Sequence, residues 1–140
     1  MSHNTPAMSL LIKLMSLHAH LLKKIDNNMS AHGISFTEFL VMHYLKDAPG
    51  KTMRRIELAE SIGLTASGVT RLLMPMEKIG LVTKESNPRD ARVSLVKLTA
   101  AGNEIFTDAA VSFEHVTTEL TGTLSAKQLT EFIKLTDALL

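Results

Sequence analysis

Residues 53–98 carry most of the structural information: MRRIELAESIG (53–63), then LTASGVTRLLMPMEKIGLV (64–82), then TKESNPRDARVSLVKL (83–98). Gly63 and Gly80 close two short helical patterns. Residues 82–85 and 92–98 have strand character on either side of the turn sequence NPRD. Two short helices followed by a basic hairpin predict a winged helix-turn-helix, in which one helix enters the DNA major groove and the hairpin lies beside it.

The second of these helices has two distinct faces. Thr65 is expected to cap it, because a threonine hydroxyl can accept from the free amide groups of the first turn. Four apolar residues follow the i, i+3, i+4, i+7 spacing of a core face: Val69, Leu72, Leu73 and Met76. The opposite face carries Ser67, Arg71, Met74 and Lys78, flanked by Gly68 and Thr70.

The N-terminal half of this helix is the predicted base-reading segment. It offers Thr65, Ser67, Gly68, Thr70 and Arg71. The hydroxyls can form hydrogen bonds with phosphates or bases, and the glycine permits close approach of the backbone to the DNA. The arginine can form a bidentate hydrogen bond with a guanine or a phosphate. The alternative is an ordinary amphipathic helix with a small polar face.

The hairpin tip adds Arg89, Asp90 and Arg92. An arginine on a wing can enter a narrow minor groove, where negative potential is concentrated. The neighbouring Asp90 is expected to hold Arg92 in an extended pose. The alternative is a solvated tip with an incidental ion pair.

Arg54 and Arg55 stand near the start of the first helix, where the helix dipole disfavours cations and a short polar cap is expected. A bound anion would relieve this. We therefore predict that at least one of them contacts a DNA phosphate or an anionic effector; the alternative is a solvated pair. Pro75, inside the second helix, removes a backbone hydrogen bond and predicts a bend just after the DNA-facing half.

Positive charge is concentrated in the same segment. Residues 51–98 hold nine Lys and Arg against five acids, a formal charge of +4, whereas the rest of the chain sums to −3. The distribution favours a polyanionic partner, although ordinary solvated faces are the alternative.

The flanking residues predict a helical layer. Residues 8–29 carry two apolar stripes at helical spacing, which indicates burial on two sides and hence contact with a second subunit. Thr37 or Ser35 is expected to cap the next helix, Thr99 a long helix, and Ser125 the last one. We expect one unit over 1–140, mainly α with a small β-hairpin wing, divided into a winged-helix lobe (35–98) and a dimerisation layer (8–32 and 99–140).

The composition disfavours several classes of protein. The chain has no Cys, which excludes disulfides and thiol redox sensing. The 140 residues contain no run long enough for a membrane span, no metal-ligand cluster, no glycine-rich phosphate loop and no nucleophile–base set. We therefore expect neither an enzyme nor a cofactor, and a cytoplasmic location.

The sequence resembles the MarR family of bacterial transcriptional regulators. The resemblance lies in ELAESIGLTASGVTRLLMPMEKIGLV and NPRDARVSLVKLTAAG, and in the flanking helices. It implies a homodimer on a pseudo-palindromic operator, usually a repressor, with contacts from Ser67, Gly68, Thr70 and Arg71 and from Arg92 supported by Asp90. Two recognition helices would then lie about 34 Å apart. Arg54 and Pro75 depart from the family pattern.

The resemblance also implies a switch driven by a small anionic or aromatic ligand between the helical layer and the DNA lobes. His18 and His43, with Met15 and Met42 close in sequence, are the candidates for that pocket. The alternative is that these are ordinary core or surface residues. A winged-helix protein-interaction or dimerisation module without DNA binding is the competing function; its recognition face would be apolar or acidic.

Overall fold

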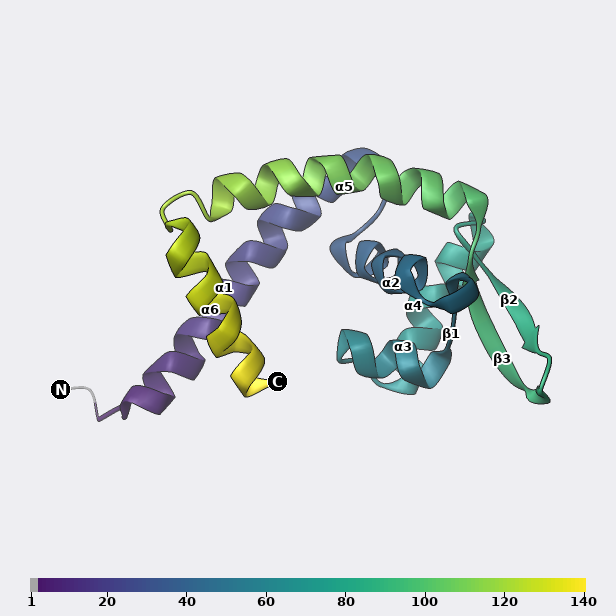
Figure 1. Cartoon of the computed structure of the whole chain (residues 1–140), viewed down its shortest axis with the longest axis horizontal. Coiled ribbons are helices and arrows are strands. Elements are labelled where there is room, and N and C mark those ends of the chain that lie inside the picture. The colour runs from purple at the N-terminus through teal and green to yellow at the C-terminus, as the bar shows by residue number, and fades with distance from the viewer. Residues whose placement is uncertain (1–2) are drawn as a thin grey trace.

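The computed structural model describes residues 3–140 and divides them into a winged lobe and three long helices (Figure 1). The lobe contains α2 (Phe36–Asp47), β1 (Thr52–Arg54), α3 (Arg55–Ile62), α4 (Ala66–Lys78), β2 (Val82–Asn87) and β3 (Asp90–Leu98). The long helices are α1 (Pro6–Met29), α5 (Ala100–Leu120) and α6 (Ala126–Leu139). Two short 3₁₀ turns, η1 (Ser30–His32) and η2 (Pro49–Lys51), complete the chain. The predicted fold class is confirmed.

The sheet is three-stranded and antiparallel, in the order β1-β3-β2. Val82 pairs with Leu98 at the base of the predicted hairpin, and Thr52 pairs with Lys97 on the other side of β3. Strand β1 was not predicted, because three residues are too few to show the alternation by which a strand is recognised.

Helix caps follow the sequence. The hydroxyls of Thr65, Thr99 and Ser125 accept hydrogen bonds from the backbone three residues later. Of the two candidates for α2, Ser35 is the cap: its hydroxyl accepts from Glu38 N at 3.1 Å, and Glu38 Oε1 accepts from Ser35 N at 2.8 Å. This reciprocal arrangement satisfies two amide groups that the helix leaves free.

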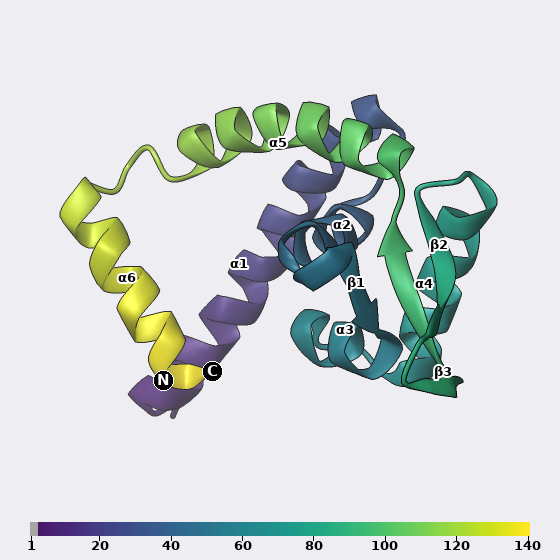
Figure 2. The same cartoon turned by 45° about the vertical axis from the view of Figure 1, so that its right-hand side comes forward.

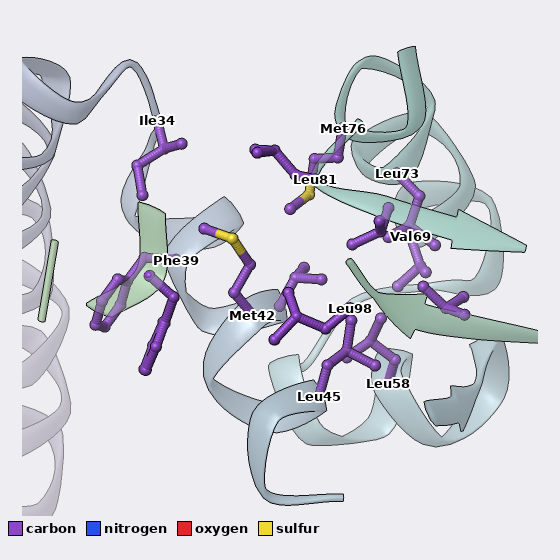
Figure 3. Packing of buried hydrophobic residues seen from close by; sticks show 14 of the residues in the cluster. Ile34, Phe39, Met42, Leu45, Leu58, Val69, Leu73, Met76, Leu81 and Leu98 are labelled. Atoms are coloured by element: carbon purple, nitrogen blue, oxygen red, sulfur yellow. The ribbon is translucent and has the colours of Figure 1, made fainter. Parts of the chain in front are cut away.

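The core lies mainly within the lobe (Figure 3). Met42 and Leu45 from α2, Leu58 from α3 and Leu73 and Met76 from α4 are completely buried. The predicted core face of α4 is confirmed, since Val69 is also fully buried and Leu72 packs against the cluster. Burying such side chains is the main driving force for folding the lobe.

Helix α5 joins the lobe to the helical layer. Phe106 stacks on Phe39 of α2 with ring centroids 4.9 Å apart. At its start, Gly102 passes so close to the backbone of Leu81 that an added Cβ would collide with the carbonyl oxygen. Thr99 Oγ1 donates to Gly80 O at 2.6 Å, so the junction between wing and α5 is both tightly packed and hydrogen-bonded.

The helical layer leaves most of its apolar side chains exposed. In the outer half of α1, Met8, Leu11, Ile12 and Met15 are each more than half exposed. No residue of α6, which the structure describes in full, is buried. Figure 2 shows α1, α5 and α6 bounding a triangle. Side chains of these three helices line an apolar hollow of about 430 Å³, among them Leu17, Leu21, Leu120, Leu129, Phe132 and Ile133. Within residues 3–140, no helix combines the length and apolar character needed to cross a membrane.

Candidate nucleic-acid interface

Helix α4 presents a polar face because its apolar face is fixed in the core. Val69, Leu73 and Met76 are completely buried, so Ser67, Thr70 and Arg71 are turned outward and exposed. The hydroxyl of Thr65 accepts from Gly68 N at 3.0 Å, which places the first turn of α4. The structure thus brings together the predicted base-reading residues on one exposed surface.

Gly68 has a structural role that was not predicted. A Cβ at this position would lie 3.1 Å from Thr65 Oγ1 and 3.7 Å from Leu64 Cβ. The first distance is tight, so a side chain would press on the hydroxyl that caps the helix. The absence of a side chain therefore protects the cap as well as leaving the backbone accessible.

The wing tip holds Arg92 as the sequence predicts. Asp90 Oδ1 accepts from Arg92 N at 3.0 Å and from Arg92 Nε at 3.1 Å. The side-chain bond and, to a lesser extent, the backbone bond lower the pKa of the Asp90 carboxyl below its usual value, so this carboxyl stays ionised. The Arg92 side chain is 91% exposed and projects from the hairpin. Arg89, also exposed, lies in the turn, where its amide donates to Asn87 Oδ1.

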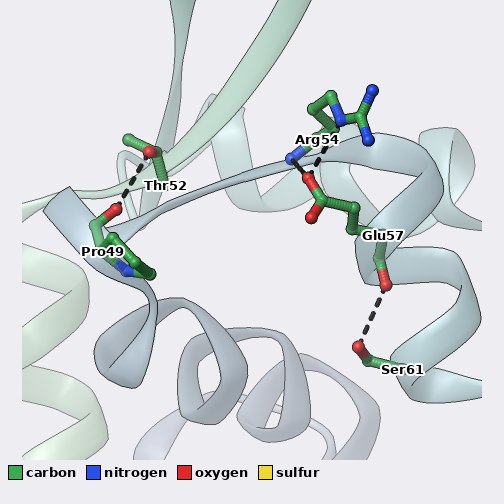
Figure 4. A network of polar contacts seen from close by, with 5 residues as sticks. All are labelled: Pro49, Thr52, Arg54, Glu57 and Ser61. Atoms are coloured by element: carbon green, nitrogen blue, oxygen red, sulfur yellow. Dashed lines mark hydrogen bonds and ion pairs between the residues drawn. The ribbon is translucent and has the colours of Figure 1, made fainter.

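Arg54 is the N-cap of α3, and the Glu57 side chain lies against it (Figure 4). Glu57 Oε1 accepts from Arg54 N and from Arg54 Nε, both at 3.1 Å. The protein therefore supplies an anion of its own at this helix start, and the contact of Arg54 or Arg55 with a phosphate or effector stays a prediction. The backbone bond from Arg54, followed by the side-chain bond, lowers the pKa of Glu57. A glutamate three residues after the cap is the sequence signal for this arrangement.

Arg55 is also paired within the protein. Its Nη2 donates to Glu77 Oε1 at 3.1 Å, and its Nη1 lies 3.5 Å from Thr70 Oγ1. Lys84 Nζ lies 3.9 Å from the other oxygen of Glu77. Sequence reasoning missed Glu77 and Lys84, since Arg55 and Glu77 are 22 residues apart and no local pattern links them.

Pro75 does not interrupt α4. The helix is continuous from Ala66 to Lys78, with Pro75 on its exposed side, and Ile79 N donates to Pro75 O at 3.1 Å. An exposed proline in the last two turns removes one backbone bond without burying the carbonyl that it leaves free. The bend at this residue stays a prediction.

The four effector candidates differ in their exposure to solvent. Met42 is completely buried in the core, whereas Met15, His18 and His43 are exposed. The His43 ring lies edge-on to Tyr44, with centroids 5.1 Å apart. The apolar hollow of the helical layer is lined by none of the four, as far as residues 3–140 are described. In that same range, no three His, Asp or Glu side chains are grouped as a metal site requires.

Comparisons with known proteins agree with this geometry. A model of the MarR family matches residues 34–94. The transcriptional regulator HosA of Escherichia coli O111:H- is 33% identical over 98 residues, which cover 70% of this chain and 71% of HosA.

Solved structures extend the likeness to the helical layer. A mutant of E. coli MarR, complexed with operator DNA, has a TM-score of 0.79 and 25% identity, over 97% of this chain and 99% of that one. Sco3205 of Streptomyces coelicolor, a MarR family regulator crystallised with DNA, has a TM-score of 0.86 at 21% identity, over 99% and 89% of the two chains. At that identity the second likeness shows the fold alone.

Proposed function

The chain belongs to the MarR family of transcriptional regulators, and from that premise we propose that two copies of it bind one double-stranded operator as a homodimer. One observation carries the proposal: α4 buries its apolar face and leaves a hydroxyl- and arginine-bearing face exposed beside a wing with arginines at its tip. The E. coli MarR structure with operator DNA, which has this fold, supports the same mode of binding.

We propose the following division of work among the DNA-facing residues. Ser67, Thr70 and Arg71 meet base edges and phosphates in the major groove, and Gly68 allows the backbone to approach. Arg92, held by Asp90, enters the adjoining minor groove, with Arg89 beside it on the backbone. Thr65 acts mainly through the cap of α4.

The arginines of α3 contribute less than their charge suggests. Arg54 is half exposed and is a proposed phosphate contact, although Glu57 offsets part of its charge. Arg55 is less than a quarter exposed and is engaged by Glu77. A phosphate would have to compete with that carboxylate.

The dimer is proposed from the surface of the helical layer. Most apolar side chains of α1 and α6 are exposed in one protomer, and Leu17, Phe132 and Ile133 among them also line the apolar hollow. Clusters of exposed apolar side chains on a folded protomer mark association surfaces. A two-fold dimer places its recognition helices about 34 Å apart, which matches a pseudo-palindromic operator.

We further propose repression that a small anionic or aromatic ligand relieves by changing the spacing of the two lobes. Met15, His18 and His43 are the accessible members of the predicted effector set; Met42 would contribute only by packing. A regulator of this kind acts where the chromosome is, in the cytoplasm, and we assign it no catalytic role.

Binding of the full-length protein to a fluorescent duplex from upstream of its own gene, measured across a salt series, tests the function. We expect binding that weakens linearly in log affinity against log salt, and a loss of at least tenfold for Arg71→Ala on the operator. Absence of any binding at low salt would favour the competing function, a protein-interaction module. Sedimentation of the same sample reports whether the bound species is a dimer.

A further inference from the structure

Glu77 lies near the C-terminal end of α4, and its carboxylate forms ion pairs with two cations from two other elements. Arg55 reaches it from the start of α3 at 3.1 Å, and Lys84 reaches it from β2 at 3.9 Å. The Glu77 and Arg55 side chains are only 25% and 23% exposed, so their pair is less screened by solvent than the pairs at the surface of the wing.

These residues line one hollow on the DNA-facing side of the lobe. Its described lining consists of Arg55, Thr70, Met74, Glu77, Lys78 and Lys84. Thr70, Met74 and Glu77 follow the i, i+4, i+7 spacing and so share a face of α4. The hollow therefore adjoins the proposed base-reading residues and contains three cations but one carboxylate.

Unpaired cations beside a recognition helix bind any DNA sequence. Lysine and arginine contacts to phosphate supply most of the sequence-independent affinity, whereas base contacts supply the discrimination. A carboxylate in the same place removes cations from phosphate binding and repels the phosphates themselves. Specificity is a difference of two affinities, and it increases when binding to wrong sequences is weakened more than binding to the operator. On the operator, base contacts fix the position of α4, whereas on other sequences a freed Arg55 or Lys84 can settle on whichever phosphates are nearest, so the freed cations favour the other sequences more.

We propose that Glu77 determines specificity by withholding Arg55 and Lys84 from the DNA backbone. The inference rests on the DNA-binding surface proposed above and adds to it a residue that acts against non-specific DNA. If Glu77 only positioned α4, its loss would instead weaken binding to every sequence.

The test compares wild type and Glu77→Gln, both full-length, on the upstream duplex and on a scrambled duplex of the same composition. Each cation that gains a phosphate contact steepens the plot of log affinity against log salt by about 0.9, or about 3.5-fold between 50 and 200 mM salt. We expect this steepening on the scrambled duplex and about threefold or more tighter binding to it at 50 mM salt. The specificity ratio should fall, because binding to the operator tightens by less.

Two further variants isolate the mechanism. Glu60→Gln removes the same formal charge from an exposed site on α3, where Glu60 makes no ion pair with another described residue, and should leave the salt slope and the ratio unchanged. When Arg55→Gln is added to Glu77→Gln, the salt slope should become about 0.9 less steep than in Glu77→Gln alone. The reason is that the guanidinium freed by the loss of Glu77 is no longer present. The double variant also tests the idea if the single one folds poorly.

The inference is overturned if Glu77→Gln weakens both duplexes alike, if slope and ratio do not change, or if Glu60→Gln has the same effect. Failure of the underlying function looks different. In that case wild type binds neither duplex, or binds both equally and Arg71→Ala changes nothing.

Discussion

The winged lobe and the helical layer bury their apolar residues in different ways. In the lobe, side chains from α2, α3, α4 and the sheet enclose one another, and the largest of them are completely buried. In the layer, α6 has no buried residue along its full described length, and the outer half of α1 exposes residues as large as Leu11 and Met15. Both regions are rich in apolar residues, so composition does not distinguish them.

The difference indicates where each region obtains its stability. The lobe is closed by its own contacts, as expected of a unit that holds α4, the helix proposed to read bases, rigidly in place. The layer has exposed apolar faces that the second copy of the proposed dimer would cover. Substitutions of equal chemistry should therefore have unequal effects in the two regions, and this can be measured.

Leu73→Ala should have the largest effect on stability. Leu73 is completely buried between α4 and the rest of the lobe, and truncation leaves a cavity that costs about 3 kcal/mol in the free energy of unfolding. Urea unfolding of the full chain measures the loss. Leu135→Ala is the matched control, since Leu135 on α6 is 69% exposed in the protomer. An equal loss at low protein concentration for both variants would contradict the contrast between lobe and layer.

Gly102→Ala tests the junction between the regions. The added methyl group would collide with the carbonyl oxygen of Leu81, and overpacking of this kind costs about 2 kcal/mol. We expect a lower midpoint of thermal unfolding and weaker operator binding, because the start of α5 is displaced from the wing. Gly122→Ala is the control, since a Cβ there lies 3.4 Å or more from its neighbours. Equal midpoints for the two variants would show that the junction tolerates the displacement.

Ile12→Glu tests whether the layer is completed by a partner. Ile12 is 57% exposed in one protomer, so a carboxylate there should leave the lobe folded. In a dimer it would be forced into an apolar interface, and we expect the dissociation constant to rise at least tenfold, about 1.4 kcal/mol. Sedimentation equilibrium gives that constant, and Lys13→Gln changes the net charge by the same −1 at an already polar position. Unchanged dimerisation of the Ile12 variant would place the interface elsewhere.

Local features of the lobe could be predicted from the sequence, because their causes are local. The caps at Thr65 and Thr99 and the core face of α4 depend on residues within two turns of one another. The ion pairs at the wing and at the start of α3 are also local, yet Glu57 was overlooked because its cap partner is an arginine rather than a serine or threonine.

Long-range features could not be predicted in this way. Neither the pairing of Arg55 with Glu77 nor the β1–β3 ladder has a sequence signal, since each depends on how distant elements pack. The same limit explains why Met42 was predicted to line the effector pocket: it is next to His43 in the sequence. Successive helix residues point about 100° apart, and here one faces the core and the other solvent.

A substitution of Glu57 at the start of α3 should give the smallest change in the free energy of unfolding. The sign of its pH dependence follows from the pKa of Glu57. Because Arg54 holds this pKa below its usual value of 4.5, the folded protein binds the proton less readily than the unfolded chain. The stabilisation is therefore complete above the unfolded value and is lost as the pH falls through the lowered folded value. The pair is half exposed, so we expect only about 0.5 kcal/mol. Urea unfolding of wild type and Glu57→Gln between pH 7 and pH 3 measures it: the two stabilities should converge in acid, and a constant difference would mean that the charge of Glu57 contributes nothing to the cap.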